Sequence, residues 1–187
     1  MADTSSLRPV ISVFGSSKVR ESDEAHRQAL ELGKALGGAG FTVATGGYSG
    51  VMEAVSRGAA EAGAPVIGVV ARSLSGKANP WVNNQITVET WDQRLFRLIE
   101  LGNGYIACPG ATGTLVELAV AWEMMAKRQL SRRPLIALGP FWRPVVEWIE
   151  SSDQKASGYV SLAESVASAI EILQASPLLR RPVIPSV

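Results

Sequence analysis

The chain has 187 residues, of which 47% are hydrophobic and 19% charged, and its formal net charge is +1. This length suits one well-packed domain, and the near-neutral charge gives no electrostatic reason to expect nucleic acid or an anionic membrane as a partner. The single cysteine cannot form an internal disulfide, and with one histidine it cannot build a usual zinc site. We find neither a secretory leader nor an apolar run of the ~20 residues that a membrane span needs. We therefore expect one cytoplasmic, metal-independent domain over residues 1–187.

Short apolar runs alternate with amphipathic stretches in the first half of the chain. Runs rich in β-branched residues predict strands, and an apolar stripe such as Ala25, Ala29, Leu32 and Leu36 predicts a helix. We expect strands at 9–14, 41–45 and 65–71, helices at 23–37 and 51–63, and a loop at 72–84 that leads to a short strand at 85–89.

The same alternation continues to residue 175. We expect helices at 91–101, 113–127, 143–151 and 160–174, and strands at 104–108 and 135–139. Residues 1–8 and 176–187 are expected to form extended or flexible tails. Strands that are apolar throughout and separated by helices predict a parallel sheet covered on both faces, which is a doubly wound α/β domain. Ligands of such domains bind at the carboxyl ends of the strands.

Three turns rich in small residues fall at that edge, at 15–17, 46–50 and 109–114. Small residues let backbone amides approach a ligand, and a helix N-terminus attracts an anion. A tight corner explains any single turn at least as well, but three turns at one edge favour a phosphate site. None of them matches G-x-G-x-x-G or the P-loop pattern, so neither a dinucleotide nor a nucleoside triphosphate is indicated. The expected contacts are Gly15, Ser16, Gly46, Gly47, Ser49, Gly50, Gly110, Ala111, Thr112, Gly113 and Thr114.

Two charged residues are candidates for chemistry, Glu117 and Arg94. Glu117 lies in the first turns of a predicted helix, where the helix dipole and local amides favour its ionised form. It is either an ordinary helix-start acid or a carboxylate placed beside a phosphorylated ligand. Arg94 shares a predicted helix with Arg97 and Glu100, so it is either a site residue or a solvated charge.

The segment from Pro109 to Glu117, PGATGTLVE, resembles the P-G-G-x-G-T-x-x-E signature of the LOG (LONELY GUY) family, whose members have often been labelled lysine decarboxylase-like. The segment from Gly46 to Met52 is similar to the family's glycine-rich turn followed by GLM, and Arg94 falls where the family has an arginine before the strand that leads into the signature. The resemblance extends from about residue 9 to residue 150.

The resemblance implies a Rossmann-like phosphoribohydrolase, which cuts the N-glycosidic bond of AMP or an N6-substituted AMP and needs no cofactor. Glu117 would stabilise an oxocarbenium-like state and orient water. Arg94 would hold the phosphate or ribose, or would position Glu117. The turn amides would bind the 5′-phosphate, and Met52 and Trp81 would line the base pocket, although an aromatic residue in a loop more often serves packing.

Two positions depart from the family pattern. Ala111 stands where the signature has its second glycine, so a methyl group would crowd the anion. If the backbone at this position needed a positive φ, alanine would be less stable than glycine there by about 1 kcal/mol. Leu95 stands where plant-type members have lysine, so a cation that could steady the phosphate is missing. Both departures put the identity of the substrate in question.

Other functions share the same anion site. LOG-like proteins also resemble carriers of the molybdenum cofactor, and a third possibility is a nucleotide-sensing subunit of an oligomer. A pyridoxal-phosphate decarboxylase is not indicated, because the lysines fall in loops or on solvated helix faces, where none suits a Schiff base. The helix segment 115–126 is apolar on more than one face, which suggests either burial within the monomer or a homodimer interface.

Overall fold

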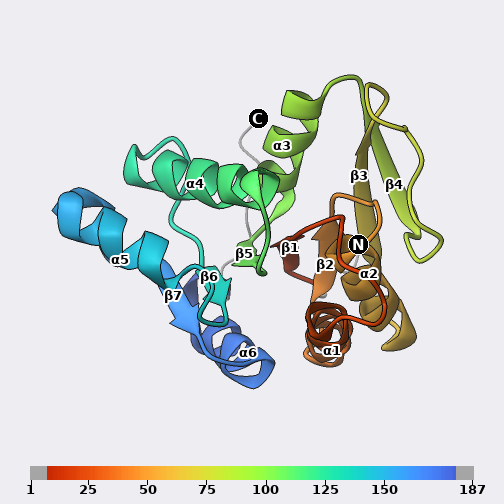
Figure 1. Cartoon of the computed structure of the whole chain (residues 1–187), viewed down its shortest axis with the longest axis horizontal. Helices are drawn as coiled ribbons and strands as arrows, with labels where there is room; N and C mark the ends of the chain where they lie inside the picture. The colour runs from red at the N-terminus through yellow and green to blue at the C-terminus, as the bar shows by residue number, and fades with distance from the viewer. Residues whose placement is uncertain (1–7, 180–187) are drawn as a thin grey trace, which may run out of the picture.

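The computed structural model describes residues 8–179, which form one seven-stranded parallel sheet (Figure 1). The strand order is β4-β3-β2-β1-β5-β6-β7, and every neighbouring pair runs parallel. The strands are β1 (Val10–Phe14), β2 (Thr42–Thr45), β3 (Val66–Ala71), β4 (Asn84–Val88), β5 (Gly104–Ala107), β6 (Leu135–Leu138) and β7 (Val160–Ala163). Of the predicted tails at 1–8 and 176–187, residues 1–7 and 180–187 lie outside the described residues, whereas Pro177–Leu179 form a 3₁₀ turn.

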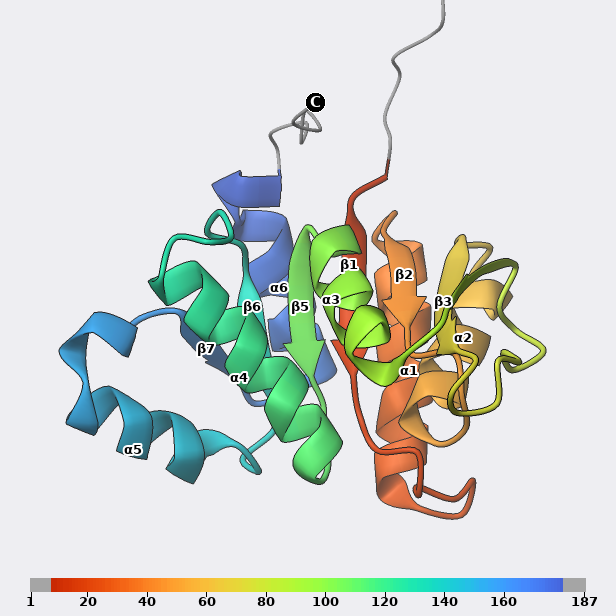
Figure 2. The same ribbon diagram turned by 90° about the horizontal axis from the view of Figure 1, so that it is seen from above.

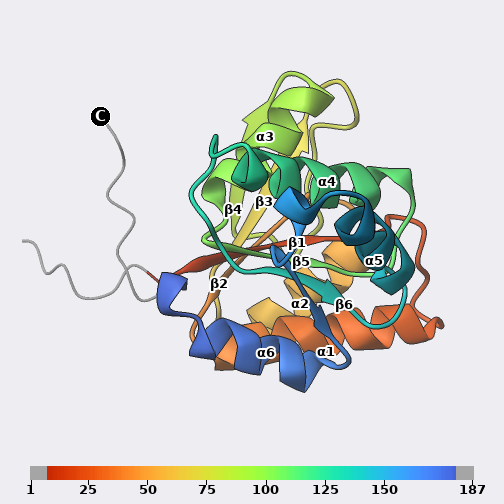
Figure 3. The same ribbon diagram turned by 90° about the vertical axis from the view of Figure 1, so that its left-hand side faces the viewer.

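Six α-helices cover both faces of the sheet. Figure 3 shows α3 and α4 on one side and α1, α2 and α6 on the other. The helices are α1 (Glu24–Gly38), α2 (Val51–Glu61), α3 (Trp91–Leu101), α4 (Thr112–Ala126), α5 (Arg143–Ser152) and α6 (Val166–Ala175), with short 3₁₀ turns at Gln154–Ala156 and Pro177–Leu179. The architecture confirms the doubly wound α/β prediction. Among residues 8–179, no helix has the length and apolarity that crossing a bilayer requires.

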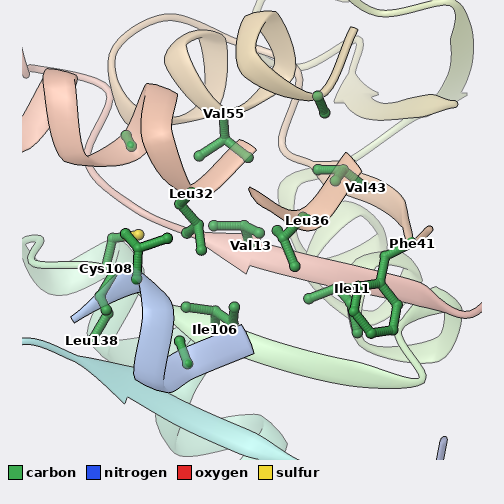
Figure 4. Packing of buried hydrophobic residues seen from close by; sticks show 14 of the residues in the cluster. Ile11, Val13, Leu32, Leu36, Phe41, Val43, Val55, Ile106, Cys108 and Leu138 are labelled. Atoms are coloured by element: carbon green, nitrogen blue, oxygen red, sulfur yellow. The ribbon is translucent and has the colours of Figure 1, made fainter. Parts of the chain in front are cut away.

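The hydrophobic core forms two layers because successive strand residues point to opposite faces. In β1, Ile11 and Val13 pack against α1, α2 and α6, whereas Phe14 packs on the other side against α3 and α4. Figure 4 shows the first layer, where Leu32, Leu36 and Val55 meet the strands. Cys108 also lies in this layer, and burial raises the pKa of its thiol to about 12. It is therefore a structural thiol rather than a nucleophile.

The predicted helix at 160–174 is wrong in its first part. Residues 160–163 form β7, which extends the sheet beside β6, and the helix starts only at Val166. Ser165 marks this start, because its side chain accepts a hydrogen bond from the backbone N–H of Ser168 in a capping box. The cap and the β-branched Val160 were the local signals for this boundary.

The order in which successive strands are added to the sheet reverses at β1. The chain builds β1, β2, β3 and β4 toward one edge, and β5, β6 and β7 then continue from the other side of β1 (Figure 2). Such a switch point leaves a crevice at the carboxyl ends of the two central strands. The turns after β1 and β5, at 15–18 and 108–111, both begin at this crevice.

Candidate functional site

A pocket of about 290 Å³ opens beside the switch point. It draws residues from the turn after β1, the start of α2, the loop between β3 and β4, the first turn of α3 and the start of α4. Its lining consists of Gly15, Ser16, Ser17, Lys18, Tyr48, Met52, Leu74, Trp91, Arg94, Ala111, Thr112, Gly113, Thr114 and Glu117. Two of the three predicted turns, after β1 and before α4, thus contribute several residues to one pocket, which both predicted charged residues also line.

The turn at residues 15–18 is fixed by the neighbouring helix start. The backbone oxygen of Ser16 accepts a hydrogen bond from the Val51 N–H at 2.9 Å, and the Ser49 hydroxyl donates to the backbone oxygen of Ser17 at 3.1 Å. Within the turn, the Lys18 N–H donates to Ser16 Oγ at 3.1 Å. These bonds hold the turn against the N-terminus of α2.

The second turn supports the pocket rather than lining it. Of residues 46–50, only Tyr48 lies on the pocket wall, so Gly46, Gly47, Ser49 and Gly50 do not occupy the predicted contact positions. The Gly47 N–H is already used by Thr45 Oγ1 at 3.1 Å, and a Cβ on Gly50 would come within 2.4 Å of the Ser16 oxygen. Gly46 leaves room for Arg94, because a Cβ there would lie 1.5 Å from Nη2 of that arginine.

The third turn presents the N-terminus of α4 to the pocket. Residues 111–114 line the wall, and Ala111, the N-cap, has no side-chain capping bond to the first amides of the helix. Gly110 is not among the lining residues. It packs against Thr114, and a Cβ at position 110 would lie 2.2 Å from Thr114 Oγ1. The backbone of Ala111 has φ −99°, which alanine adopts without strain. The departure from glycine therefore adds only a methyl group at the pocket edge.

Arg94 is a buried charge with protein partners, which rules out a solvated role. Arg94 is 6% exposed, and its Nε donates to the backbone oxygens of Val69 at 2.9 Å and Gly46 at 3.3 Å. Nη2 contacts the Met52 sulfur at 3.4 Å, and the guanidinium carbon lies 5.1 Å from the centre of the Tyr48 ring. Burial lowers the pKa of Arg94, but a guanidinium stays protonated in proteins.

Glu117 is the sixth residue of α4, and its side chain is buried against Arg94. Its Oε1 lies 3.8 Å from Arg94 Nη1, too long for a hydrogen bond. Burial raises the pKa of Glu117 to about 7, and the positive charge of Arg94 opposes that rise. Burial thus opposes the ionised form that a position near the helix N-terminus was expected to favour, and its effect on the pKa is larger than that of Arg94. The Glu117 oxygens remain able to accept hydrogen bonds from a molecule in the pocket.

Four lining residues have large apolar or aromatic side chains. They are Tyr48, Met52, Leu74 and Trp91, and the Tyr48 hydroxyl is held by the backbone N–H and oxygen of Ala71. Leu74 and Trp91 are 54% and 43% exposed, so they form a rim that is open to solvent. Met52 lies where the sequence placed it. Trp81 does not line the pocket; the Arg57 guanidinium lies 5.5 Å from its ring.

Five lining residues were not among the predicted contacts: Ser17, Lys18, Tyr48, Leu74 and Trp91. Trp91 precedes Arg94 by three positions, which places both on one helix face, and this spacing could have identified it. Ser17 and Tyr48 belong to turns that were already marked, and Lys18 directly follows the first of these turns, whereas Leu74 lies in a loop without a local signal. Leu95 is buried in the core, so the position where plant-type members have lysine does not face this pocket. Within residues 8–179, no group of three His, Cys, Asp or Glu side chains could hold a metal ion.

Residues 8–170, which are most of the chain, match the family model described as the SLOG cluster4 family. The chain belongs to the SLOG cluster4 family. This result confirms the LOG-type resemblance of the signature around Glu117.

Curated relatives of this SLOG cluster4 chain include plant and bacterial proteins. It is 29% identical over 153 residues to the cytokinin riboside 5′-monophosphate phosphoribohydrolase LOG of Oryza sativa subsp. japonica, covering 78% of this chain and 62% of that protein. It is 25% identical over 148 residues to the protein of the same activity from Rhodococcoides fascians, covering 75% of this chain and 73% of the relative. The match thus spans less than two thirds of the rice protein.

Solved structures of similar fold carry a different description. The molybdenum cofactor carrier protein of Chlamydomonas reinhardtii superposes with a TM-score of 0.74 at 28% identity, covering 93% of this chain and 99% of that one. The molybdenum cofactor binding protein of Rippkaea orientalis gives a TM-score of 0.75 at 26% identity, covering 90% and 96%. SLOG cluster4 membership therefore leaves both an enzyme and a carrier as candidates.

Proposed function

We propose that this protein hydrolyses the N-glycosidic bond of a nucleoside 5′-monophosphate, AMP or an N6-substituted AMP, and releases the base and ribose 5-phosphate. The observation that supports this most is the buried Glu117 carboxylate, which lines the pocket, has Arg94 as its ion-pair partner and still has oxygens available to a ligand. A carrier has no evident use for a buried carboxylate at such a place, since its desolvation is costly.

The pocket lining has groups that suit both parts of a nucleotide. The first amides of α4 and the turn at 15–18 would take the phosphate, because a helix N-terminus and closely spaced amides favour an anion. The apolar rim of Tyr48, Leu74 and Trp91 would take the flat face of the base. The volume of about 290 Å³ lies near the lower end of the roughly 300–1,000 Å³ of small-ligand pockets.

The hydrolysis step requires only water and the carboxylate. The bond between C1′ and the base nitrogen breaks, its electron pair leaves with the base, and the sugar gains oxocarbenium character that the negative charge of Glu117 stabilises. Water then attacks C1′ and loses a proton to Glu117; the departing base takes up a proton from solvent, and Glu117 later returns its proton to solvent. A carboxyl group with a pKa near 7 is well suited to accept that proton at neutral pH.

The experiment is incubation with AMP and several N6-substituted AMPs, followed by chromatographic detection of free base and ribose 5-phosphate. We expect product from the native protein and at least a hundredfold less from Glu117→Gln and from Arg94→Ala, with circular dichroism showing that both variants stay folded. Arg97→Ala, which removes an exposed arginine of the same helix, is the matched control and should retain activity. Absence of product from every nucleotide would contradict the proposal.

The second candidate is a carrier of a phosphorylated ligand such as the molybdenum cofactor. It is favoured by the solved carrier from Chlamydomonas reinhardtii, which this chain covers over 99% of its length. A carrier would bind a phosphorylated pterin without releasing product, and Glu117→Gln would leave that affinity unchanged. We place it second because it gives the buried pair of Arg94 and Glu117 no task.

We also propose that the protein forms a homodimer. The supporting observation is that α3 and α4, which pack side by side, leave apolar side chains on their outer faces.

A further inference from the structure

The part of the pocket wall that the structure describes carries two cationic side chains, Arg94 and Lys18. Arg94 is committed to the protein: Nε serves two backbone oxygens, Nη2 contacts the Met52 sulfur and Nη1 faces Glu117. A guanidinium held in this way can position the carboxylate, but it has little freedom to follow a phosphate group. The role of phosphate clamp, which the resemblance left open for Arg94, therefore needs another residue.

Lys18 has the opposite properties. It is exposed, and in the described part of the chain no carboxylate pairs with its ammonium group. Its backbone is nevertheless fixed, because the hydrogen bonds from Val51 and Ser49 hold the turn at 15–18 in place. The result is a mobile cation on a rigid base at the pocket edge.

Other groups that can bind an anion also line the pocket. They are the uncapped N-terminus of α4 at residues 112–114 and the hydroxyl-bearing Ser16 and Ser17. Leu95, at the position where the family's plant-type members have lysine, points into the core and supplies no charge. Lys18 is thus the one cation of the described pocket that is available to neutralise a ligand.

We propose that Lys18 recognises the 5′-phosphate of the substrate and makes the pocket selective for a phosphomonoester over the corresponding nucleoside. The inference rests on the proposed function and adds the residue that sets this selectivity. A phosphomonoester carries a charge of about −1.5 to −2 at neutral pH. A flexible ammonium is a suitable point-charge partner for it, and the helix dipole adds to the attraction.

Calorimetric titration with AMP and adenosine tests this without requiring hydrolysis. In the Glu117→Gln background, where AMP stays intact, Lys18→Gln should weaken AMP binding about tenfold and leave adenosine binding unchanged. Lys18→Arg, which keeps the charge, should retain most of the affinity. The matched control is Lys127→Ala, which removes the same charge from the far end of α4. The AMP affinity of Lys18→Gln should also depend less on salt concentration, whereas Lys18→Arg and Lys127→Ala should keep the original dependence.

The outcomes separate this inference from the proposed function. Equal AMP affinity with and without Lys18, or an equal loss for adenosine, overturns the role of Lys18 even if the native protein hydrolyses AMP. A Lys18-dependent affinity for AMP in a protein that releases no base supports the phosphate role and refutes the hydrolase. If AMP does not bind to the native protein at all, the role of Lys18 is refuted as well.

Discussion

Glu117 experiences opposing influences on its charge. Burial favours the protonated form and raises the pKa to about 7, while Arg94 at 3.8 Å favours the ionised form. The carboxyl group is therefore balanced between its two states near neutral pH. A general base works best under this condition, because it accepts a proton readily and still loses it in the next step.

This balance predicts the pH dependence of hydrolysis. Only ionised Glu117 can stabilise the sugar cation and accept a proton, so kcat/KM should rise with pH and level off above about 7. Arg94→Lys should retain a similar profile. Arg94→Ala removes a charge that lowers the pKa, so any residual activity should shift to higher pH. Direct AMP binding, measured over the same range, separates this effect from titration of the phosphate. A flat profile would contradict the assigned role.

Glu117 should also make the stability of the fold depend on pH. Its pKa is about 7 in the folded chain and about 4.5 without burial, so the stabilising contribution of the protonated form is complete below 4.5 and is lost as pH rises through 7. The unfolding free energy of Glu117→Gln minus that of the native protein should therefore increase by on the order of 3 kcal/mol as the pH rises from 4.5 to 8. Urea unfolding of both proteins at each pH measures this difference. No change with pH would show that the carboxyl is effectively solvated.

Gly46 determines whether Arg94 can occupy its place. A methyl group at this position would lie 1.5 Å from Nη2 and 2.6 Å from the Met52 sulfur, so Gly46→Ala must displace the guanidinium. We expect Gly46→Ala to reduce hydrolysis nearly as strongly as Arg94→Ala. The control is Gly38→Ala, at an exposed helix position where a Cβ meets nothing within 4 Å. Unchanged activity in Gly46→Ala would show that the position of Arg94 is not critical.

At the scale of elements, α3 holds Arg94 in place because the two ends of this helix are secured. At the first turn, Thr90 and Gln93 form a capping box. At the other end, Nη1 of Arg133 donates to the backbone oxygens of Ile99 at 3.1 Å and Gly102, and to the Tyr105 hydroxyl at 2.8 Å. A positive charge at a helix C-terminus also interacts favourably with the dipole.

Arg133→Ala should therefore destabilise the protein by about 1–3 kcal/mol, because several carbonyl oxygens lose their donor. Urea unfolding would show the loss as a lower midpoint. Arg97→Ala, on the exposed face of the same helix, should change stability by less than about 0.5 kcal/mol. Similar values for the two variants would mean that Arg133 does not secure α3.

At the scale of the whole molecule, the outer faces of α4 and α3 carry exposed apolar side chains. The inner face of α4 packs Leu118, Ala121 and Met125 into the core, but Leu115 on its outer face is 37% exposed. Phe96 of the adjoining α3 is 45% exposed, and all three views show these helices side by side (Figures 1, 2 and 3). Apolar side chains on neighbouring outer faces are typical of a surface that another protein covers.

We expect light scattering after size exclusion to give twice the chain mass of 19.8 kDa. Replacing Phe96 and Leu115 by glutamate should produce the monomer, because charges would be buried at a symmetric interface. Trp148→Glu, at a 72% exposed aromatic residue on α5, is the control and should leave the dimer intact. A monomeric native protein, or a dimer that only the α5 change disrupts, would contradict this interface.

The sequence determined the layered fold, since strand and helix periods depend on local patterns of apolar residues. It also identified Glu117, Arg94 and two turns of the pocket through the signature and its spacing. The β7 boundary was misjudged because a short apolar run fits either period until the strand pairs with β6. Only the tertiary structure decided that Gly46 makes room for Arg94, that Leu95 faces the core and that Lys18 faces the pocket. It also showed that burial raises the pKa of Glu117, because desolvation depends on residues that are distant in the chain.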